Sequence, residues 1–145
     1  MTQRLKSFVE IHPDSDFPLE NLPYGIFNDH NNSQPRACST LGEWVIDLAA
    51  LEENGYLKLK AEQNYFNQPT LNKFIESGKP NWSKVRTELQ SLFSADNPVL
   101  RDNTEFRKKI FFKKTEVKMH LPVHIPGYTD FYSSKEHATN VGCMF

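Results

Sequence analysis

A short hairpin pattern in the first half of the chain constrains the fold more than any other feature. Residues 36–40 and 44–48 read as two strands, and a tight turn at Gly42 separates them. The second strand alternates large apolar side chains at a period of two, which places them on one face. A two-stranded hairpin of this length is not stable by itself in water. The pattern therefore predicts further strands, arranged as a small β-barrel or meander.

Three helical patterns follow in the middle of the chain. The first starts near Pro69 and ends at Gly78, a natural capping residue. The second starts near Asn81 and ends before Pro98, and the third covers residues 102–110. The second helix carries one apolar stripe that we predict to be core; it consists of Trp82, Val85, Leu89, Leu92 and Phe93. Strands and helices together predict a mainly β fold with a few helices (α+β).

Composition excludes several classes of protein. The chain has 145 residues, the length of one domain, and 17 basic residues against 18 acidic ones give a net charge of −1. This balance argues against a sequence-independent nucleic-acid binder, which usually has a basic excess. We find neither the roughly 18 apolar residues of a membrane helix nor a signal-peptide core. Two distant cysteines, Cys38 and Cys143, are too few for a disulfide scaffold, so we expect a reduced, cytoplasmic protein.

The densest cluster of chemically capable residues lies near the C-terminal end. Asp130, Tyr132 and His137 supply a carboxylate, a phenol and an imidazole. If residues 128–132 form a strand, the carboxylate shares an otherwise aromatic face, which is unusual for a plain core strand. Carboxylate oxygens are the ligands that Ca²⁺ and Mg²⁺ prefer, and an imidazole accepts a proton near neutral pH. The cluster is therefore a candidate for metal binding and general base catalysis.

A simpler interpretation of the same cluster is structural. Ser133 and Ser134 would cap a helix that begins at Lys135, and His137 would lie on the surface of that helix. The residue types and their spacing leave this interpretation and the catalytic one open.

Other candidate residues lack the spacing that their chemistry requires. Cys38 has no metal-ligand spacing such as C-x₂-C. His120 and His124 are four residues apart, but Pro122 forbids the helix that would align them. The basic run at residues 107–109 has aromatic neighbours of the kind that contact RNA, and a solvated helix face is the simpler interpretation.

Five sequence blocks that span almost the whole chain resemble the fumarylacetoacetase family. They occur in the order in which that family has them, and the long C-terminal block is far more specific than a short motif. The blocks are DSDFPLENLPYGIF at residues 14–27, FNQPTLN at 66–72, LRDNTE at 100–105, MHLP at 119–122 and YTDFYSSKEHATNVG at 128–142.

The resemblance implies a hydrolase that cleaves a carbon–carbon bond of fumarylacetoacetate. The products are fumarate and acetoacetate, at the last step of tyrosine and phenylalanine catabolism. The resemblance also implies an SH3-like small N-terminal barrel, a β-rich catalytic domain, a homodimer and one bound Ca²⁺ or Mg²⁺. By match, Asp130 is a metal ligand, Tyr132 binds the substrate and His137 is the general base that activates water.

The resemblance also sets the expected domain organisation. Residues 1–118 correspond to the N-terminal barrel domain with its helices, and residues 119–145 to the beginning of the catalytic domain, including its first strand. Lys135–Glu136 replaces the Arg-Gln of familiar members without changing the spacing. The family motif continues with an arginine after Phe145, and further metal carboxylates follow it. We therefore expect a truncated chain that is inactive alone; the alternative is a non-catalytic module that contacts a protein or domain through an apolar face.

Overall fold

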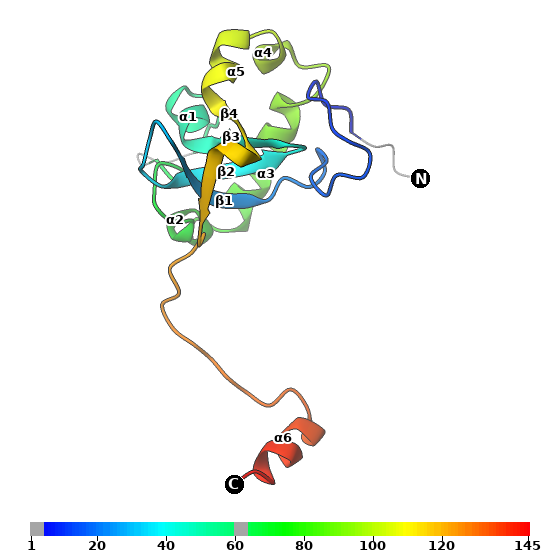
Figure 1. Cartoon of the computed structure of the whole chain (residues 1–145), viewed down its shortest axis with the longest axis vertical. Helices are drawn as coiled ribbons and strands as arrows, with labels where there is room; N and C mark the ends of the chain where they lie inside the picture. Colours follow the sequence, from blue (N-terminus) through cyan, green and yellow to red (C-terminus); the bar gives the residue numbers. More distant parts are fainter. Residues whose placement is uncertain (1–4, 60–63) are drawn as a thin grey trace.

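The computed structural model of the chain describes residues 5–59 and 64–145. In chain order, the elements within these ranges are β1 (Tyr24–Asp29), β2 (Arg36–Leu41), β3 (Trp44–Asp47), α1 (Leu48–Glu53), α2 (Asn72–Glu76), α3 (Lys79–Leu92), α4 (Pro98–Arg101), α5 (Thr104–Ile110), β4 (Phe111–Lys113), the 3₁₀ helix η1 (Lys114–Glu116), β5 (Val117–His120) and α6 (Lys135–Gly142). Figure 1 shows a sheet with helices packed around it and an extended segment that leads from β5 to α6.

The strands form an antiparallel sheet in the order β4-β3-β2-β1-β5. β4 and β5 lie at opposite edges of this sheet, yet only the short helix η1 connects them. Because so short a connection cannot cross a flat five-stranded sheet, the sheet curls until its edges approach each other. The result is a half-barrel with a few helices, which confirms the predicted α+β fold class and its small N-terminal barrel.

The two faces of the sheet bury different clusters, because successive residues of a strand point to opposite sides. One face contributes Ile26, Ala37 and Ile46 to a large core that the helices complete. The other face gathers one apolar side chain from each strand. These residues are Phe27, Cys38 and Val45, with Phe112 and Val117 packed against them. All five strands therefore converge on one small cluster, as expected for the inside of a curled sheet.

The predicted hairpin is confirmed, with a correction at its end. β2 and β3 pair on either side of a two-residue turn, in which Gly42 takes a positive φ of 57°. The strand expected over residues 44–48 stops one residue early, because the Asp47 carboxylate accepts the Ala50 N–H at 3.0 Å and caps α1. Leu48 therefore begins a helix instead of completing a strand.

The apolar stripe of α3 is confirmed over most of its length. Gly78, with a φ of 83°, separates α2 from α3 as a helix-ending residue should. The buried stripe residues are Val85, Leu89, Leu92 and Phe93. The prediction was wrong for Trp82, which is 37% exposed and donates its indole N–H to the Phe74 carbonyl oxygen at 2.8 Å. This tryptophan lies in the first turn of α3, where the helix reaches the edge of the core.

A buried ionic network lies on the face of the sheet that carries the small cluster. Arg36 donates from Nε to Asp47 at 2.6 Å and from Nη2 to Asp29 at 2.7 Å. None of the three residues is more than 8% exposed. The guanidinium carbon also lies 4.3 Å from the centre of the Phe27 ring. The face of an aromatic ring attracts a cation, so this contact stabilises the charged arginine. Strand pairing places Arg36 opposite Phe27, so the network is built by the register of β1 and β2.

After β5 the chain continues as an extended segment that ends in α6 (Figure 1). Residues 121–134 contain no strand, so the strand considered for residues 128–132 does not form among the described residues. A strand requires a neighbour for its backbone hydrogen bonds, and no described residue supplies one there. The predicted division between residues 118 and 119 falls within β5 and stays a prediction.

Truncation of the two aromatic residues at the ends of the stripe should have unequal effects. Phe93→Ala removes a fully buried ring and should lower the free energy of unfolding by about 3–5 kcal/mol. Trp82→Ala removes a partly exposed ring and one hydrogen bond, and should cost about 1–2 kcal/mol. Urea denaturation of both variants tests this order; equal costs would contradict the placement of Trp82 at the edge of the core.

The ionic network should make the fold sensitive to acid. Burial would raise the pKa of Asp29, but hydrogen bonds from Arg36 and from the backbone of Asn31 and Asn32 outweigh it and lower the pKa below 3.8. Because the folded pKa is depressed, the stabilisation is complete above the unfolded pKa and disappears as pH falls through the folded value. Unfolding free energies measured from pH 6 to 3 should therefore fall less steeply in Asp29→Asn, and an unchanged slope would contradict this assignment.

Candidate functional site

The helix α6 begins where the sequence predicted, and a serine caps it. The Ser134 side chain accepts the backbone N–H of His137 at 3.1 Å, so its hydroxyl satisfies one of the free donors of the first turn. This confirms the predicted cap before Lys135. The cap also holds the backbone of the candidate base in its first helical turn, close to the residues that precede the helix.

The imidazole of His137 contacts two residues of the preceding loop. Its ring centre lies 5.5 Å from that of Tyr132, edge to face at 87°. Its Nδ1 lies 3.4 Å from the Ser133 hydroxyl and 3.5 Å from the Ser133 backbone nitrogen, both long for hydrogen bonds. The structure thus brings together Tyr132 and His137, which are five residues apart, through the turn that the serine cap creates. Both side chains are exposed.

The third predicted residue, Asp130, stands apart from this pair. Its side chain is exposed and makes no hydrogen bond or ion pair with any described residue. Among the described residues, no group of three or more histidine, cysteine, aspartate or glutamate side chains could hold a metal ion. One carboxylate falls short of the six to eight oxygen ligands that Ca²⁺ takes. The residues present therefore do not form a metal site by themselves.

The weaker candidates are accounted for by packing. His120 ends β5 and its Nε2 lies 2.6 Å from Asn28 Oδ1, so its ring is a satisfied polar group of the sheet. Burial raises the pKa of the Cys38 thiol to about 12, which makes it a poor nucleophile and metal ligand. Arg107 lies 5.3 Å from the centre of the Phe8 ring, and Lys108 pairs with Glu105 at 2.8 Å. Two of the three residues of the basic run are therefore engaged with neighbouring residues.

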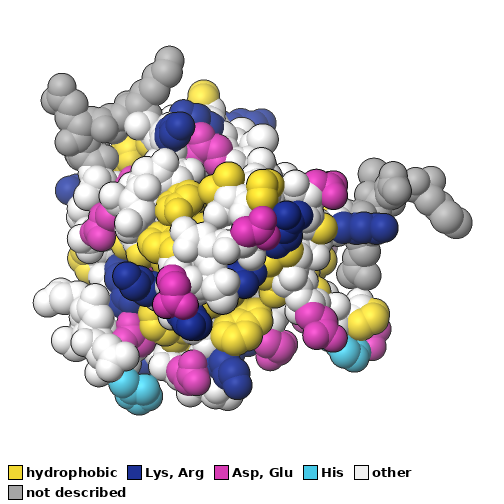
Figure 2. All heavy atoms as spheres, turned by 90° about the horizontal axis from the view of Figure 1, so that it is seen from above, with side chains coloured by type: hydrophobic (Ala, Val, Ile, Leu, Met, Phe, Trp, Pro, Cys, Tyr) yellow, Lys and Arg dark blue, Asp and Glu magenta, His cyan; other side chains and the backbone are white. Residues whose placement is uncertain are grey.

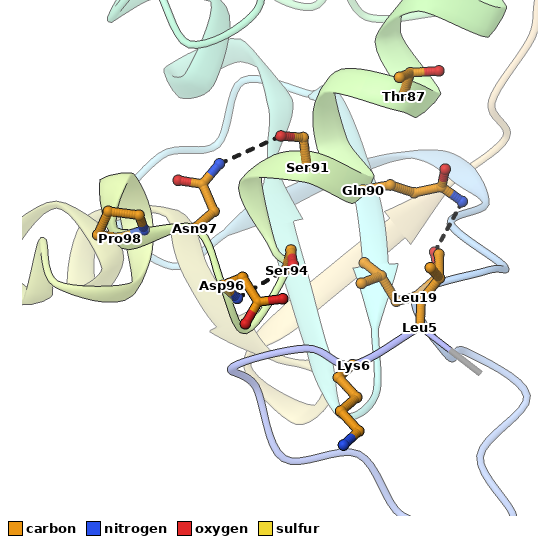
Figure 3. Close-up of a pocket in the computed structure, with 10 residues that line it drawn as sticks. All are labelled: Leu5, Lys6, Leu19, Thr87, Gln90, Ser91, Ser94, Asp96, Asn97 and Pro98. Carbon is orange, nitrogen blue, oxygen red and sulfur yellow. Dashed lines mark hydrogen bonds between the residues drawn. The ribbon is translucent and has the colours of Figure 1, made fainter. Parts of the chain in front are cut away.

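A cavity of about 920 Å³ lies between the N-terminal segment and the end of α3 (Figure 3). Several of its polar side chains form hydrogen bonds with neighbouring residues. Asn97 donates to the Ser91 hydroxyl at 3.4 Å, and Gln90 donates to the Leu19 carbonyl oxygen at 3.3 Å. Ser94 accepts the backbone N–H of Asp96 at 3.3 Å. None of the three candidate residues lines this cavity, so it is separate from the C-terminal cluster.

The surface shows a mixture of charges. On the face seen in Figure 2, basic and acidic side chains alternate around small apolar areas, and no large area carries one sign. Within residues 5–59 and 64–145, no helix has both the length and the apolar character needed to cross a membrane.

The curled half-barrel is followed by the exit segment, residues 121–134, which joins this small N-terminal domain to a histidine-bearing helix. The chain belongs to the fumarylacetoacetase N-terminal family, whose model matches residues 20–122, more than half of the chain. That match covers the sheet and the helices from α1 to α5. The resemblance found in the sequence blocks is thereby confirmed.

Curated relatives agree with this assignment. The chain is 47% identical over 145 residues to the fumarylacetoacetase of Dictyostelium discoideum. It is 45% identical over 141 residues to that of Homo sapiens and 43% identical over 143 residues to that of Arabidopsis thaliana. These matches cover 96–97% of this chain but 33–34% of each relative. The chain therefore spans about a third of the length of the curated relatives it matches.

The absence of a ligand cluster among the described residues leads to a prediction for metal binding. The 145-residue chain should bind Ca²⁺ and Mg²⁺ weakly or not at all, because Asp130 supplies a single exposed carboxylate. Calorimetric titration measures this directly, with Asp130→Ala as the comparison. Tight, stoichiometric binding that the substitution abolishes would show that the chain forms a metal site unaided.

Proposed function

We propose that this chain is the N-terminal part of a fumarylacetoacetase, a hydrolase that cleaves fumarylacetoacetate to fumarate and acetoacetate in tyrosine and phenylalanine catabolism. The observation that carries the proposal is the match of nearly the whole chain to proteins of that name. The chain contributes the half-barrel domain and the segment with the candidate residues. Because it spans a third of those relatives, the proposed activity belongs to the complete protein.

The contact between Tyr132 and His137 supports the assignment of the general base. A base must lie within reach of the water it activates and must be held in a fixed orientation. The Ser134 cap holds the backbone of His137. The edge-to-face contact with the Tyr132 ring limits the rotation of the imidazole. His137 then removes a proton from the attacking water, while the Tyr132 hydroxyl donates a hydrogen bond to the substrate.

The proposed cofactor is one Ca²⁺ or Mg²⁺ ion. Asp130 would provide one of its ligands, and carboxylates from outside this chain would provide the others. When bound, such an ion stabilises negative charge on substrate oxygens. We further propose that the complete protein is a cytoplasmic homodimer whose partner is its small-molecule substrate, without a nucleic-acid or membrane partner.

A non-catalytic role in protein–protein or domain–domain contact is the second candidate. The exit segment favours it, because four of its large apolar side chains are between 70% and 88% exposed. These residues are Leu121, Ile125, Tyr128 and Phe131. Exposed apolar side chains in such number indicate a surface that another segment or chain covers. Catalysis by the complete protein separates the two candidates.

Replacement of the two candidate residues in the complete protein should give different results. His137→Ala should lower kcat by about 10²–10⁴-fold, the usual share of general base catalysis, and should affect KM less. Asp130→Ala should weaken metal binding, so added Ca²⁺ or Mg²⁺ should restore part of its activity. The measurement is kcat and KM against pH and metal concentration for both variants.

The exposed His30 offers a matched control, since His30→Ala should leave kcat unchanged. Near-wild-type kcat in His137→Ala would remove this histidine from the mechanism and leave it a surface residue of α6.

A further inference from the structure

The exit segment is held against the body beyond the end of β5. The backbone N–H of Leu71 donates to the Pro122 carbonyl oxygen at 2.8 Å. The side-chain amide of Asn72 makes two more bonds: its Nδ2 donates to the His124 carbonyl oxygen at 2.8 Å, and its Oδ1 accepts the His124 backbone N–H at 2.8 Å. Val123, between these anchor points, packs against the large core.

The carboxamide of Asn72 forms the pair of hydrogen bonds with the His124 backbone that a neighbouring strand would otherwise form. A peptide group in a sheet offers one donor and one acceptor, and a primary carboxamide offers both on one rigid plane. Aspartate would supply the acceptor alone, and alanine would supply neither. Asn72 opens α2, and the buried Phe74 anchors that short helix in the core. We call the two hydrogen bonds between the Asn72 side chain and the His124 backbone the Asn72 clamp. The clamp is attached to a fixed part of the fold, because Phe74 holds α2 in place.

We propose that Asn72 is a positioning residue, which fixes where the chain leaves the half-barrel and so where the candidate catalytic segment begins. The catalytic part of this inference rests on the proposed function. Asp130 is the sixth residue after His124, and a fully extended chain covers about 3.3–3.6 Å per residue. The hydrogen bonds to Asn72 therefore confine Asp130 to within about 22 Å of His124, and Pro126 restricts the path further.

The first experiment tests the clamp in the 145-residue chain. Amide hydrogen exchange of His124 should be about tenfold faster in Asn72→Ala, because both hydrogen bonds are lost. Asn72→Asp should keep much of the protection, since a carboxylate still accepts this N–H although it cannot donate to the carbonyl. Asn81→Ala is the control, because the Asn81 side chain donates to the Ser77 carbonyl oxygen, which is its single partner among residues 5–59 and 64–145. Unchanged exchange of His124 in Asn72→Ala would overturn the clamp.

The second experiment tests positioning in the complete protein. Asn72→Ala should lower kcat by about 10–10²-fold, the effect of a displaced catalytic group, and should change KM less. Asn72→Asp should restore part of kcat, and Asn81→Ala should match the wild type. Faster exchange at His124 with unchanged kcat would overturn the positioning role. An inactive wild type would overturn the proposed function and the positioning role with it, while the exchange experiment would still decide the clamp.

Discussion

One buried guanidinium connects the loop, the sheet and the first helix of this domain. Arg36 bridges two carboxylates, and each carboxylate also holds backbone. Asp29 accepts the N–H groups of Asn31 and Asn32 in the loop between β1 and β2, while Asp47 caps α1. Removal of Arg36 would leave two buried negative charges without a cationic partner, a situation that typically costs about 3–5 kcal/mol. The loop between β1 and β2 and the start of α1 therefore depend on a single cation.

The domain and the candidate site are held by different means. The half-barrel buries a large core, whereas Asp130, Tyr132 and His137 are exposed on a segment whose order comes from a serine cap and a ring contact. The Asn72 clamp lies between these two regions. This arrangement gives the N-terminal domain a physical role in the proposed enzyme, because it fixes the starting point of the segment that the remaining domain must engage.

Turns, caps and hydrophobic periodicity depend on neighbouring residues and made much of the fold predictable. Contacts between residues far apart in the sequence could not be predicted from the sequence pattern. The hairpin turn at Gly42 and the cap at Ser134 depend on neighbouring residues, so both could be predicted. Periodicity identified the stripe of α3 but could not show that Trp82 lies at the exposed edge of the core. The partners of Arg36 and Asn72 are set by strand register and by a contact 52 residues away, and no local spacing encodes them.

Hydrolysis of fumarylacetoacetate by the complete protein and by the 145-residue chain, assayed side by side at equal concentration, tests this account most directly. The complete protein should hydrolyse the substrate, because it would add the metal carboxylates that the described residues lack. The 145-residue chain should show no turnover above the uncatalysed rate while remaining folded by circular dichroism. Inactivity of the complete protein under conditions in which it is folded and supplied with Ca²⁺ or Mg²⁺ would contradict the account.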